Sequence, residues 1–485
     1  MFKLKRWLAL LAIGVIGGVV FNNANEYKAQ ATSKTDNTVV VNNDTTVSSK
    51  YSFIFRWIDG KTTAQTFNFG QGSFDSTKVT PDLYHGYGGT NYMYHLKSRN
   101  DLGKFGIMYH NVGTYRGKTI DLKITITDYD PRNPSGGIQF SEGIISLNTQ
   151  DMASVKQRWD FYDAKTNEKV KINGYITIND IDWTQGVTFD SETSKHIQNV
   201  LVTKDTIVDV KKSNGEIAVQ DSGLHKDIDP MTKKGWATVL FNDADNLTFK
   251  WCVHDLDSKP YQCHEPEKVK WKGRWDGDYF GYTEKKLART EIITPEKYIQ
   301  SNGNKVTEKT ITSDDGVEYS LLHKVPDEIS DFYYGNYELK DEVPDCLKIK
   351  SYGIYNEASQ NVSNLFDDKT SGNSIRYVAK KNSLEKDFFY GHDYYVKIKA
   401  DVYKPNVSKY KVNHDAQIKN YFTVTIDGKT KRSNDTILKI KHQSPPSPVK
   451  TASIDKVNFD GKEFTYDVKQ QKQNTYLKIQ NNSVN

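Results

Sequence analysis

The sequence predicts an all-β protein, in which an N-terminal β-sandwich region is followed by an immunoglobulin-like sandwich domain. The 485 residues include 30 tyrosines and 21 phenylalanines but only five methionines, and aromatic residues favour half-buried pleated sheets. In "KTIDLKITITDY" (118–129), Ile120, Leu122, Ile124 and Ile126 alternate with polar residues, which predicts a strand with one buried face. Long helical periodicity is absent. The length suffices for two to four domains.

The first 31 residues predict a secretory signal peptide. Three basic residues precede an apolar run from Trp7 to Phe21, and Ala29 and Ala31 form an A-x-A cleavage site. An uncleaved membrane anchor is the alternative, although the run is short for a span. No other segment is apolar enough to cross a bilayer, so we expect a secreted or cell-surface protein without a membrane span after cleavage.

Four further segments follow the signal peptide. A polar, aromatic-poor stretch predicts a disordered lead-in, and a long series of alternating runs with Asn and Asp turns predicts the β-sandwich region. The polar, Gly- and Asn-broken stretch "TPEKYIQSNGNKVTEKT" then indicates a domain boundary near residue 300. Short strands spaced by about ten to twenty residues predict the immunoglobulin-like domain. The segments are 32–50, 51–300, 301–443, and a proline linker with an incomplete repeat at 444–485.

The incomplete repeat is inferred from internal similarity. Residues 308–326 resemble residues 449–471, with Lys309-Thr310 corresponding to Lys450-Thr451 at a spacing of 141 residues. Chance similarity between two polar hairpins is the alternative. We expect residues 449–485 to be poorly ordered, because the strands that would complete this second domain are missing downstream.

The balance of charge gives no case for a nucleic-acid partner. The 66 basic and 61 acidic residues leave a net charge of +5 without a dense basic patch.

Cysteine and acidic motifs leave several readings open. Cys252 and Cys263 can form a disulfide, remain inert thiols, or join His254 and His264 in a metal site, although the spacing lacks a zinc signature. Several D-x-D pairs suggest calcium or turn chemistry, and Asp180 with Asp182 is the leading calcium candidate. We predict neither a metal nor a cofactor.

The C-terminal half contains, in this order, "EKT…GVEYSLLHKVP", "YELKDEVPDCLKI", "FYGHDYYVKIKADV" and "NYFTVTIDGKTKRSNDTILKI". With these pieces in the family's order, residues 309–440 resemble the isopeptide-forming domains of fimbrial and cell-wall adhesins of Gram-positive bacteria. Two N-terminal pieces, "HNVGTYRGKTIDLKITITDY" and "VKINGYITINDIDWTQGV", are similar to the region that precedes such domains.

The resemblance implies an autocatalytic amide bond between a lysine in the first strand and an asparagine in the last, assisted by an acid. Burial among aromatic residues would neutralise the amine and protonate the acid, and contact would supply effective concentration. Its candidate residues are Lys309 as nucleophile, Asp341 as the acid with Glu342 and Glu318 as lesser options, and Asn434 or Asn420 as the amide, with Asn434 preferred.

In the alternative interpretation, Lys309 is an ordinary solvated lysine, and Asp341, Asn420 and Asn434 are turn residues. A bond from residue 309 to residue 434 would close a 125-residue loop and stabilise the fold by about 4 to 5 kcal/mol.

We therefore predict a surface adhesin or fimbrial stalk component that is not an enzyme. Its partners would be a host protein, matrix protein or glycan, together with other cell-wall components. Apart from Trp7, every tryptophan lies in residues 51–300, where aromatic rings either bind a ligand or pack a core. A secreted carbohydrate-binding or carbohydrate-active protein is the rival interpretation, and a passive spacer is a third.

Overall fold

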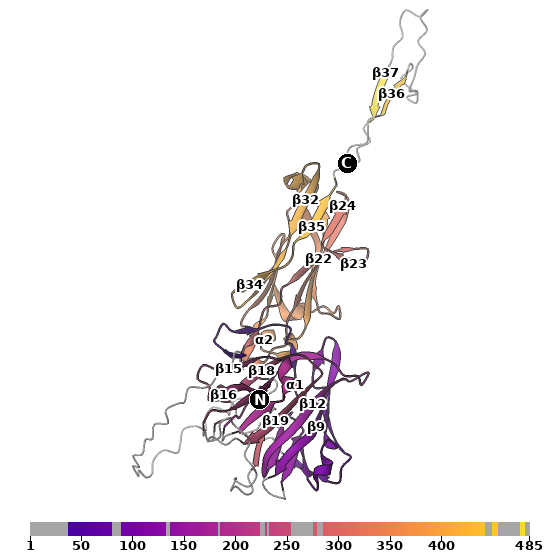
Figure 1. Cartoon of the computed structure of the whole chain (residues 1–485). Coiled ribbons are helices and arrows are strands. Elements are labelled where there is room, and N and C mark those ends of the chain that lie inside the picture. The colour runs from indigo at the N-terminus through magenta and orange to yellow at the C-terminus, as the bar shows by residue number, and fades with distance from the viewer. Residues whose placement is uncertain are drawn as a thin grey trace, which may run out of the picture.

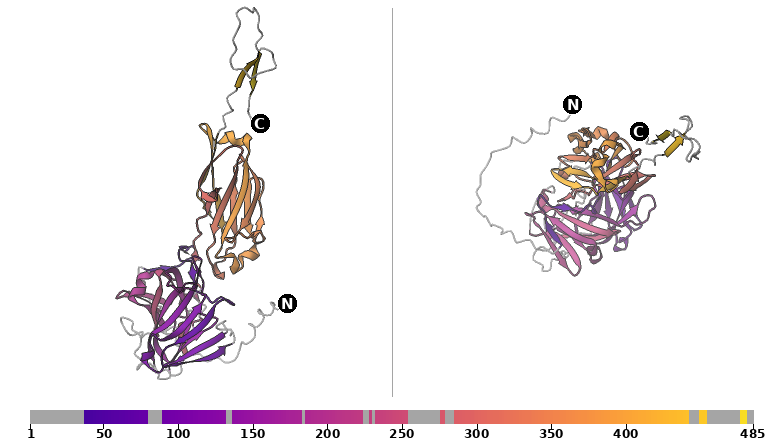
Figure 2. Two further views of the ribbon diagram at one scale, coloured as in Figure 1. Left: turned by 90° about the vertical axis from the view of Figure 1, so that its right-hand side faces the viewer. Right: turned by 90° about the horizontal axis from the view of Figure 1, so that it is seen from above.

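The computed structural model describes residues 37–79, 89–131, 136–182, 185–223, 228–229, 232–253, 275–278, 285–441, 449–453 and 476–480. The predicted signal peptide, Cys263 and the proline linker lie outside these residues. The described chain forms an N-terminal domain (37–291), a C-terminal domain (296–441) and a separate hairpin (Figures 1 and 2). The structure is all-β, as the sequence predicts.

One large antiparallel sheet forms a wall of the N-terminal domain. Its long central strand β9 carries the four alternating aliphatic residues of the sequence pattern, all fully buried, so the predicted half-buried strand is confirmed. In spatial order the sheet contains β16 (Val208–Ser213), β17 (Glu216–Asp221), β14 (Gln185–Phe189), β19 (Asn246–Val253), β12 (Met152–Asp163), β9 (Lys118–Pro131), β7 (Phe105–His110) and β4 (Thr63–Asn68), with β8 (Thr114–Tyr115) beside β9.

Two five-stranded sheets share a single apolar core with this wall. The core joins residues of all three sheets, for example Trp159, Val239 and Phe140. One sheet contains β1 (Thr38–Val40), β15 (Ile197–Val202), β18 (Ala237–Ala244), β13 (Ile172–Ile178) and β3 (Phe53–Ile54). The other contains β20 (Trp275–Asp278), β11 (Leu147–Gln150), β10 (Gly137–Ser141), β6 (Gly89–His95) and β5 (Ser73–Val79).

The lead-in differs from its predicted disorder over the residues that the structure describes. Strand β1 pairs in parallel with β15, and β2 (Thr46–Val47) pairs in parallel with β21 (Arg289–Thr290). The polar composition concealed these strands because each is only two or three residues long. The pairing of β2 with β21 also places residues 289 and 290 in the N-terminal domain.

The C-terminal domain packs three sheets around a second core. It begins at β22, so the domain change lies between residues 291 and 296, slightly before the predicted boundary. The first sheet contains β23 (Asn304–Val306), β22 (Glu296–Ser301), β25 (Gly316–Lys324), β30 (Asp393–Val402) and β27 (Leu347–Tyr355). The second contains β28 (Phe366–Asp368), β29 (Ser374–Ala379), β26 (Tyr337–Glu342), β33 (Phe422–Ile426) and β34 (Lys429–Arg432). The third contains β24 (Glu308–Ile311), β35 (Thr436–Ile440), β32 (Asp415–Asn420) and β31 (Lys411–Val412).

Helices are short and occur in connections. The α-helices are α1 (Ser191–His196), α2 (Lys381–Leu384) and α3 (Lys404–Val407). The 3-10 turns are η1 (Arg99–Asp101), η2 (Lys233–Gly235), η5 (Ser330–Phe332), η6 (Ser363–Leu365), η7 (Asp387–Phe389) and η8 (Ser408–Tyr410). Within the described residues, no helix is long and apolar enough to cross a membrane. Beyond the C-terminal domain, β36 (Val449–Ser453) pairs antiparallel with β37 (Tyr476–Gln480).

Ion pairs connect the two domains, and most of them have the cation on the N-terminal domain. Among the described residues, the N-terminal domain supplies the cation and the C-terminal domain the carboxylate in four pairs. An exposed fifth pair, between Lys429 and Asp44 at 3.4 Å, has the opposite sense. The four pairs are Arg56–Asp327 (2.5 Å), Lys233–Asp331 (2.8 Å), Lys286–Glu328 (2.6 Å) and Arg289–Asp427 (2.6 Å).

Candidate cross-linking site

A lysine, an aspartate and an asparagine meet in the core of the C-terminal domain. Lys297 and Asp341 have fully buried side chains and form an ion pair between Nζ and Oδ2. Asn420 donates from Nδ2 to the other carboxylate oxygen, Oδ1, at 3.0 Å. One carboxylate therefore bridges an amine and a primary amide.

Strand alternation directs all three side chains inward. Each residue occupies the buried row of its strand, where successive side chains point to opposite faces. Lys297 lies on β22, Asp341 on β26 and Asn420 at the end of β32, so the cluster draws one residue from each of the three sheets. The buried apolar residues in the same rows are Ile299 on β22, Tyr337 and Leu339 on β26, and Ala416 and Ile418 on β32.

Burial favours the neutral amine at Lys297. Desolvation lowers the pKa of Lys297, and the opposing attraction of Asp341 does not cancel it. The ammonium nitrogen lies 4.6 Å from the ring centroid of Tyr319, which is itself fully buried. Burial also raises the pKa of the Tyr319 hydroxyl, so this phenol remains protonated beside the cluster.

The amide of Asn420 is held at both ends. Its Oδ1 accepts a hydrogen bond from the main-chain N–H of Tyr421 at 2.8 Å, while its Nδ2 donates to Asp341. Only 5% of Asn420 is exposed. A donor on the carbonyl oxygen supports negative charge there during attack on the amide carbon.

The structure brings together two of the residues that the sequence proposed for the bond. Asp341 and Asn420 are in contact, whereas Asn434 hydrogen-bonds the main chain of Lys297 through both ends of its amide. Lys309 lies on β24 and donates to the carbonyl oxygen of Gln300 at 3.0 Å.

The two lesser acid candidates lie apart from the cluster. Glu342 is exposed and pairs with Lys340 at 2.8 Å, and Glu318 pairs with Lys399 at 3.5 Å.

Lys297 was not among the residues proposed from the sequence. It falls in "TPEKYIQSNG", which the polar composition assigned to a domain boundary. The available signal was the short alternation around Tyr298, which places Lys297 and Ile299 on the same inward face.

A second buried lysine–carboxylate pair lies between the domains. Lys286 and Glu328 are 2% and 0% exposed, with Nζ and Oε2 2.6 Å apart. Thr290 contacts both partners, accepting from Lys286 Nζ at 2.8 Å and donating its N–H to Glu328 Oε1 at 2.9 Å. Desolvation lowers the pKa of Lys286 as well. Among the residues that the structure describes, no asparagine or glutamine side chain hydrogen-bonds to this pair.

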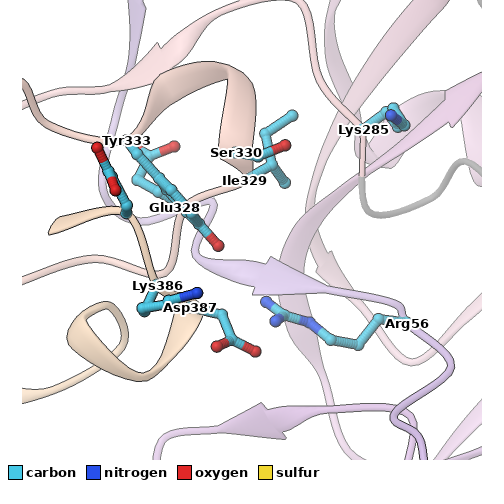
Figure 3. Close-up of a pocket in the computed structure, with 9 residues that line it drawn as sticks. Arg56, Lys285, Glu328, Ile329, Ser330, Tyr333, Lys386 and Asp387 are labelled. Atoms are coloured by element: carbon cyan, nitrogen blue, oxygen red, sulfur yellow. The ribbon is translucent and has the colours of Figure 1, made fainter. Parts of the chain in front are cut away.

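A cavity of about 460 Å³ opens beside this second pair. Figure 3 shows Arg56 and Lys285 of the N-terminal domain facing residues of the C-terminal domain across it. Its lining mixes basic and acidic side chains with Tyr333. The C-terminal-domain residues that line it are Glu328, Ile329, Ser330, Tyr333, Glu385, Lys386 and Asp387.

The other sequence candidates have structural roles where they are described. Trp159, Trp236 and Trp251 are fully buried, which fits core packing. Cys252 is disulfide-bonded, and its predicted partner Cys263 lies outside the described residues. Cys346 is a buried free thiol.

The leading calcium candidates lie in the connection between β13 and β14. Asp180 adopts a positive φ of 60°, and Asp182 accepts hydrogen bonds from Gln185 and Ile228. Within the described ranges, no group of three or more His, Cys, Asp or Glu residues is placed to hold a metal ion.

Comparison with known proteins gives matches to solved structures only. No protein-family model and no curated protein matches the chain. The N-terminal domain of the Streptococcus gordonii adhesin Sgo0707 is 11% identical, with a TM-score of 0.35 over 81% of this chain and 95% of that one. The major pilin subunit BcpA of Bacillus cereus is 14% identical, with a TM-score of 0.28 over 59% and 68%. Domains D2 and D3 of the Corynebacterium diphtheriae major pilin SpaD are 12% identical, with a TM-score of 0.23 over 33% and 53%.

Proposed function

We propose that the C-terminal domain forms an intramolecular amide bond between Lys297 Nζ and Asn420 Cγ, and that the chain is a secreted surface adhesin or stalk protein strengthened by that bond. The observation that carries the proposal is the single buried carboxylate of Asp341, which contacts the amine with one oxygen and the amide nitrogen with the other. The N-terminal domain would contact a host protein, matrix protein or glycan.

The chemistry needs no external reagent. Asp341 takes a proton from the Lys297 ammonium, which leaves a neutral amine and a neutral acid in a site where burial disfavours charge. The Lys297 nitrogen then attacks Asn420 Cγ, and the carbonyl oxygen gains negative charge beside the Tyr421 N–H.

Collapse of the tetrahedral intermediate completes the bond. Asp341 transfers a proton to Nδ2 of Asn420, which it already contacts, and accepts one from the former amine. The C–N bond to Nδ2 breaks and ammonia leaves, so one N–C bond replaces another. The reaction occurs once per chain and produces a structural link rather than turnover.

The bond would protect most of the domain from extension. It would bypass residues 298 to 419, which number 122, and a fully extended chain of that length spans roughly 400 Å. Strand β22 is the first strand of the domain, and β32 pairs with the last strand, β35. Tension entering at residue 296 would therefore pass through the bond close to the exit strand. Such protection suits a protein exposed to shear at a surface.

Intact mass of the full chain, after reduction of disulfides, tests the proposal. The expected mass lies about 17 Da below that of the sequence, because one ammonia is lost when the nucleophile displaces the amide nitrogen. Asn420→Ala should restore the full mass. Lys309→Ala is the matched control, because Lys309 lies outside the cluster and its variant should retain the deficit. A deficit that disappears in Lys309→Ala and persists in Asn420→Ala would refute this assignment.

A further inference from the structure

Asn434 completes the hydrogen bonding of Lys297 at an edge of β22 where no described strand pairs with this residue. Strand β23 pairs with β22 from Ile299 onward only, while β25 covers the other edge. At Lys297, Asn434 Oδ1 accepts from the main-chain N–H and Nδ2 donates to the main-chain carbonyl, both at 2.8 Å. The amide side chain thus takes the place of a neighbouring strand for this one residue.

The residue before Asn434 holds the strand that follows the reactive amide. Ser433 donates its N–H to the carbonyl oxygen of Phe422 at 2.9 Å and accepts from the Phe422 N–H through Oγ at 3.0 Å. Phe422 lies two residues after Asn420. Two consecutive residues therefore fix both reacting segments. Ser433 holds the main chain next to Asn420, and Asn434 holds the main chain of Lys297.

We infer that Asn434 is a positioning residue that sets the rate of cross-linking by fixing the main chain of Lys297. The inference rests on the proposed function. The lysine nitrogen lies at the end of a flexible four-carbon stem, so a small rotation of the backbone displaces it strongly. Attack on an amide requires the nitrogen within contact distance and aligned with the carbonyl, and a displacement of about 1 Å can slow such a step about 100-fold.

Asn434 itself is exposed, so truncation leaves no cavity in the core. Its loss should affect the reaction more than the fold. Asn373 provides a matched control in the same domain, because its Nδ2 also donates to main-chain carbonyls, those of Pro344 and Leu347 at 3.1 and 2.9 Å. These bonds hold the turn after β26, and among the described residues Asn373 makes no hydrogen bond to Lys297, Asp341 or Asn420.

The experiment follows ammonia loss in newly made full-length chain. Cell-free synthesis is stopped in denaturant at successive times, and intact mass gives the cross-linked fraction. Asn434→Ala should slow the reaction about 10- to 100-fold, Asn434→Asp should show an intermediate rate because it keeps the acceptor for the Lys297 N–H, and Asn373→Ala should react within about twofold of the unaltered chain.

Two results would overturn the inference in distinguishable ways. Equal rates in Asn434→Ala and the unaltered chain would remove the positioning role while leaving the cross-link in place. If the unaltered chain never loses ammonia, the proposed function itself is refuted. If Asn434→Ala folds poorly by near-ultraviolet circular dichroism, the Asn434→Asp rate decides, and a rate equal to that of the unaltered chain contradicts the inference.

Discussion

Within the described residues, two lysines, Lys297 and Lys286, are buried against carboxylates, and their surroundings differ. Both amines are almost fully buried, and desolvation lowers the pKa of both. At Asp341 the second carboxylate oxygen contacts the Asn420 amide, whereas at Glu328 it accepts the main-chain N–H of Thr290.

Burial and a carboxylate do not suffice for a cross-link. An ammonium and a carboxylate alone form an ion pair, and a primary amide adds an electrophilic carbon with ammonia as its leaving group. The Lys286–Glu328 pair joins two domains, while the Lys297–Asp341 pair has the Asn420 amide beside it as the proposed target of the amine.

The largest effect is expected from Lys297→Met. This change removes the nucleophile, so the mass deficit should vanish. The free energy of unfolding should fall by about 4 to 5 kcal/mol through loss of chain closure. Mass spectrometry and chemical denaturation measure the two consequences. Unchanged stability would contradict a structural role for the link.

The same substitution at the second lysine, Lys286→Met, should keep the mass deficit. Glu328 would be left buried without its cation, which lowers the free energy of unfolding by about 3 to 5 kcal/mol. The contact between the two domains should weaken as a result. Small-angle scattering and limited proteolysis between residues 285 and 296 should report looser domains. Loss of the mass deficit in this variant would break the distinction between the two pairs.

A smaller, pH-dependent effect should distinguish free Lys297 from cross-linked Lys297. In Asn420→Ala the amine remains titratable with a lowered pKa, so the unfolded chain binds more protons than the folded chain between that pKa and the ordinary lysine value of 10.5. Stability of this variant should therefore rise with pH in that window. If the proposed bond forms in the unaltered chain, Lys297 is an amide there and does not titrate.

The stability gap between the two proteins should narrow from pH 7 to pH 9.5, as measured by urea denaturation. Lys286 titrates in both proteins and its contribution cancels. A gap that widens over this range would contradict the burial of a free amine at Lys297.

The smallest effect is expected at the rim of the domain contact. Arg56 and Asp327 are partly exposed, with side chains 20% and 35% accessible. Arg56→Ala should therefore cost only about 0.2 to 1 kcal/mol, and the loss should shrink in high salt. Thermal unfolding at two salt concentrations checks this. A loss as large as that of Lys286→Met would place the main interdomain energy at the rim.

Sequence reasoning predicted the fold class well because strand alternation is a local pattern. The buried row of β9 can be read from twelve consecutive letters, 118–129. The short strands β1 and β2 escaped prediction because their pairing partners lie far away in the chain, in β15 and β21.

The candidate site was predictable in part. Asp341 and Asn420 were proposed from their place in a resembling pattern, and the structure puts them in contact. Lys309 was proposed as the lysine of the first strand in that pattern, but it lies on β24 beside the last strand and contacts Gln300.

Composition could not single out Lys297, because the sequence of a polar segment does not show which of its lysines is buried. The signal for its burial is the alternation in β22, which places Lys297 and Ile299 on the same inward face.

The most direct test of the cross-link is peptide mapping of the unaltered full chain. The proposed bond predicts a branched peptide in which Lys297 and Asn420 are joined by an amide, with fragment ions from both backbones and a mass about 17 Da below the sum of its two parts. The same digest of Asn420→Ala should yield two linear peptides. Linear peptides carrying free Lys297 and intact Asn420 in the unaltered chain would contradict the account.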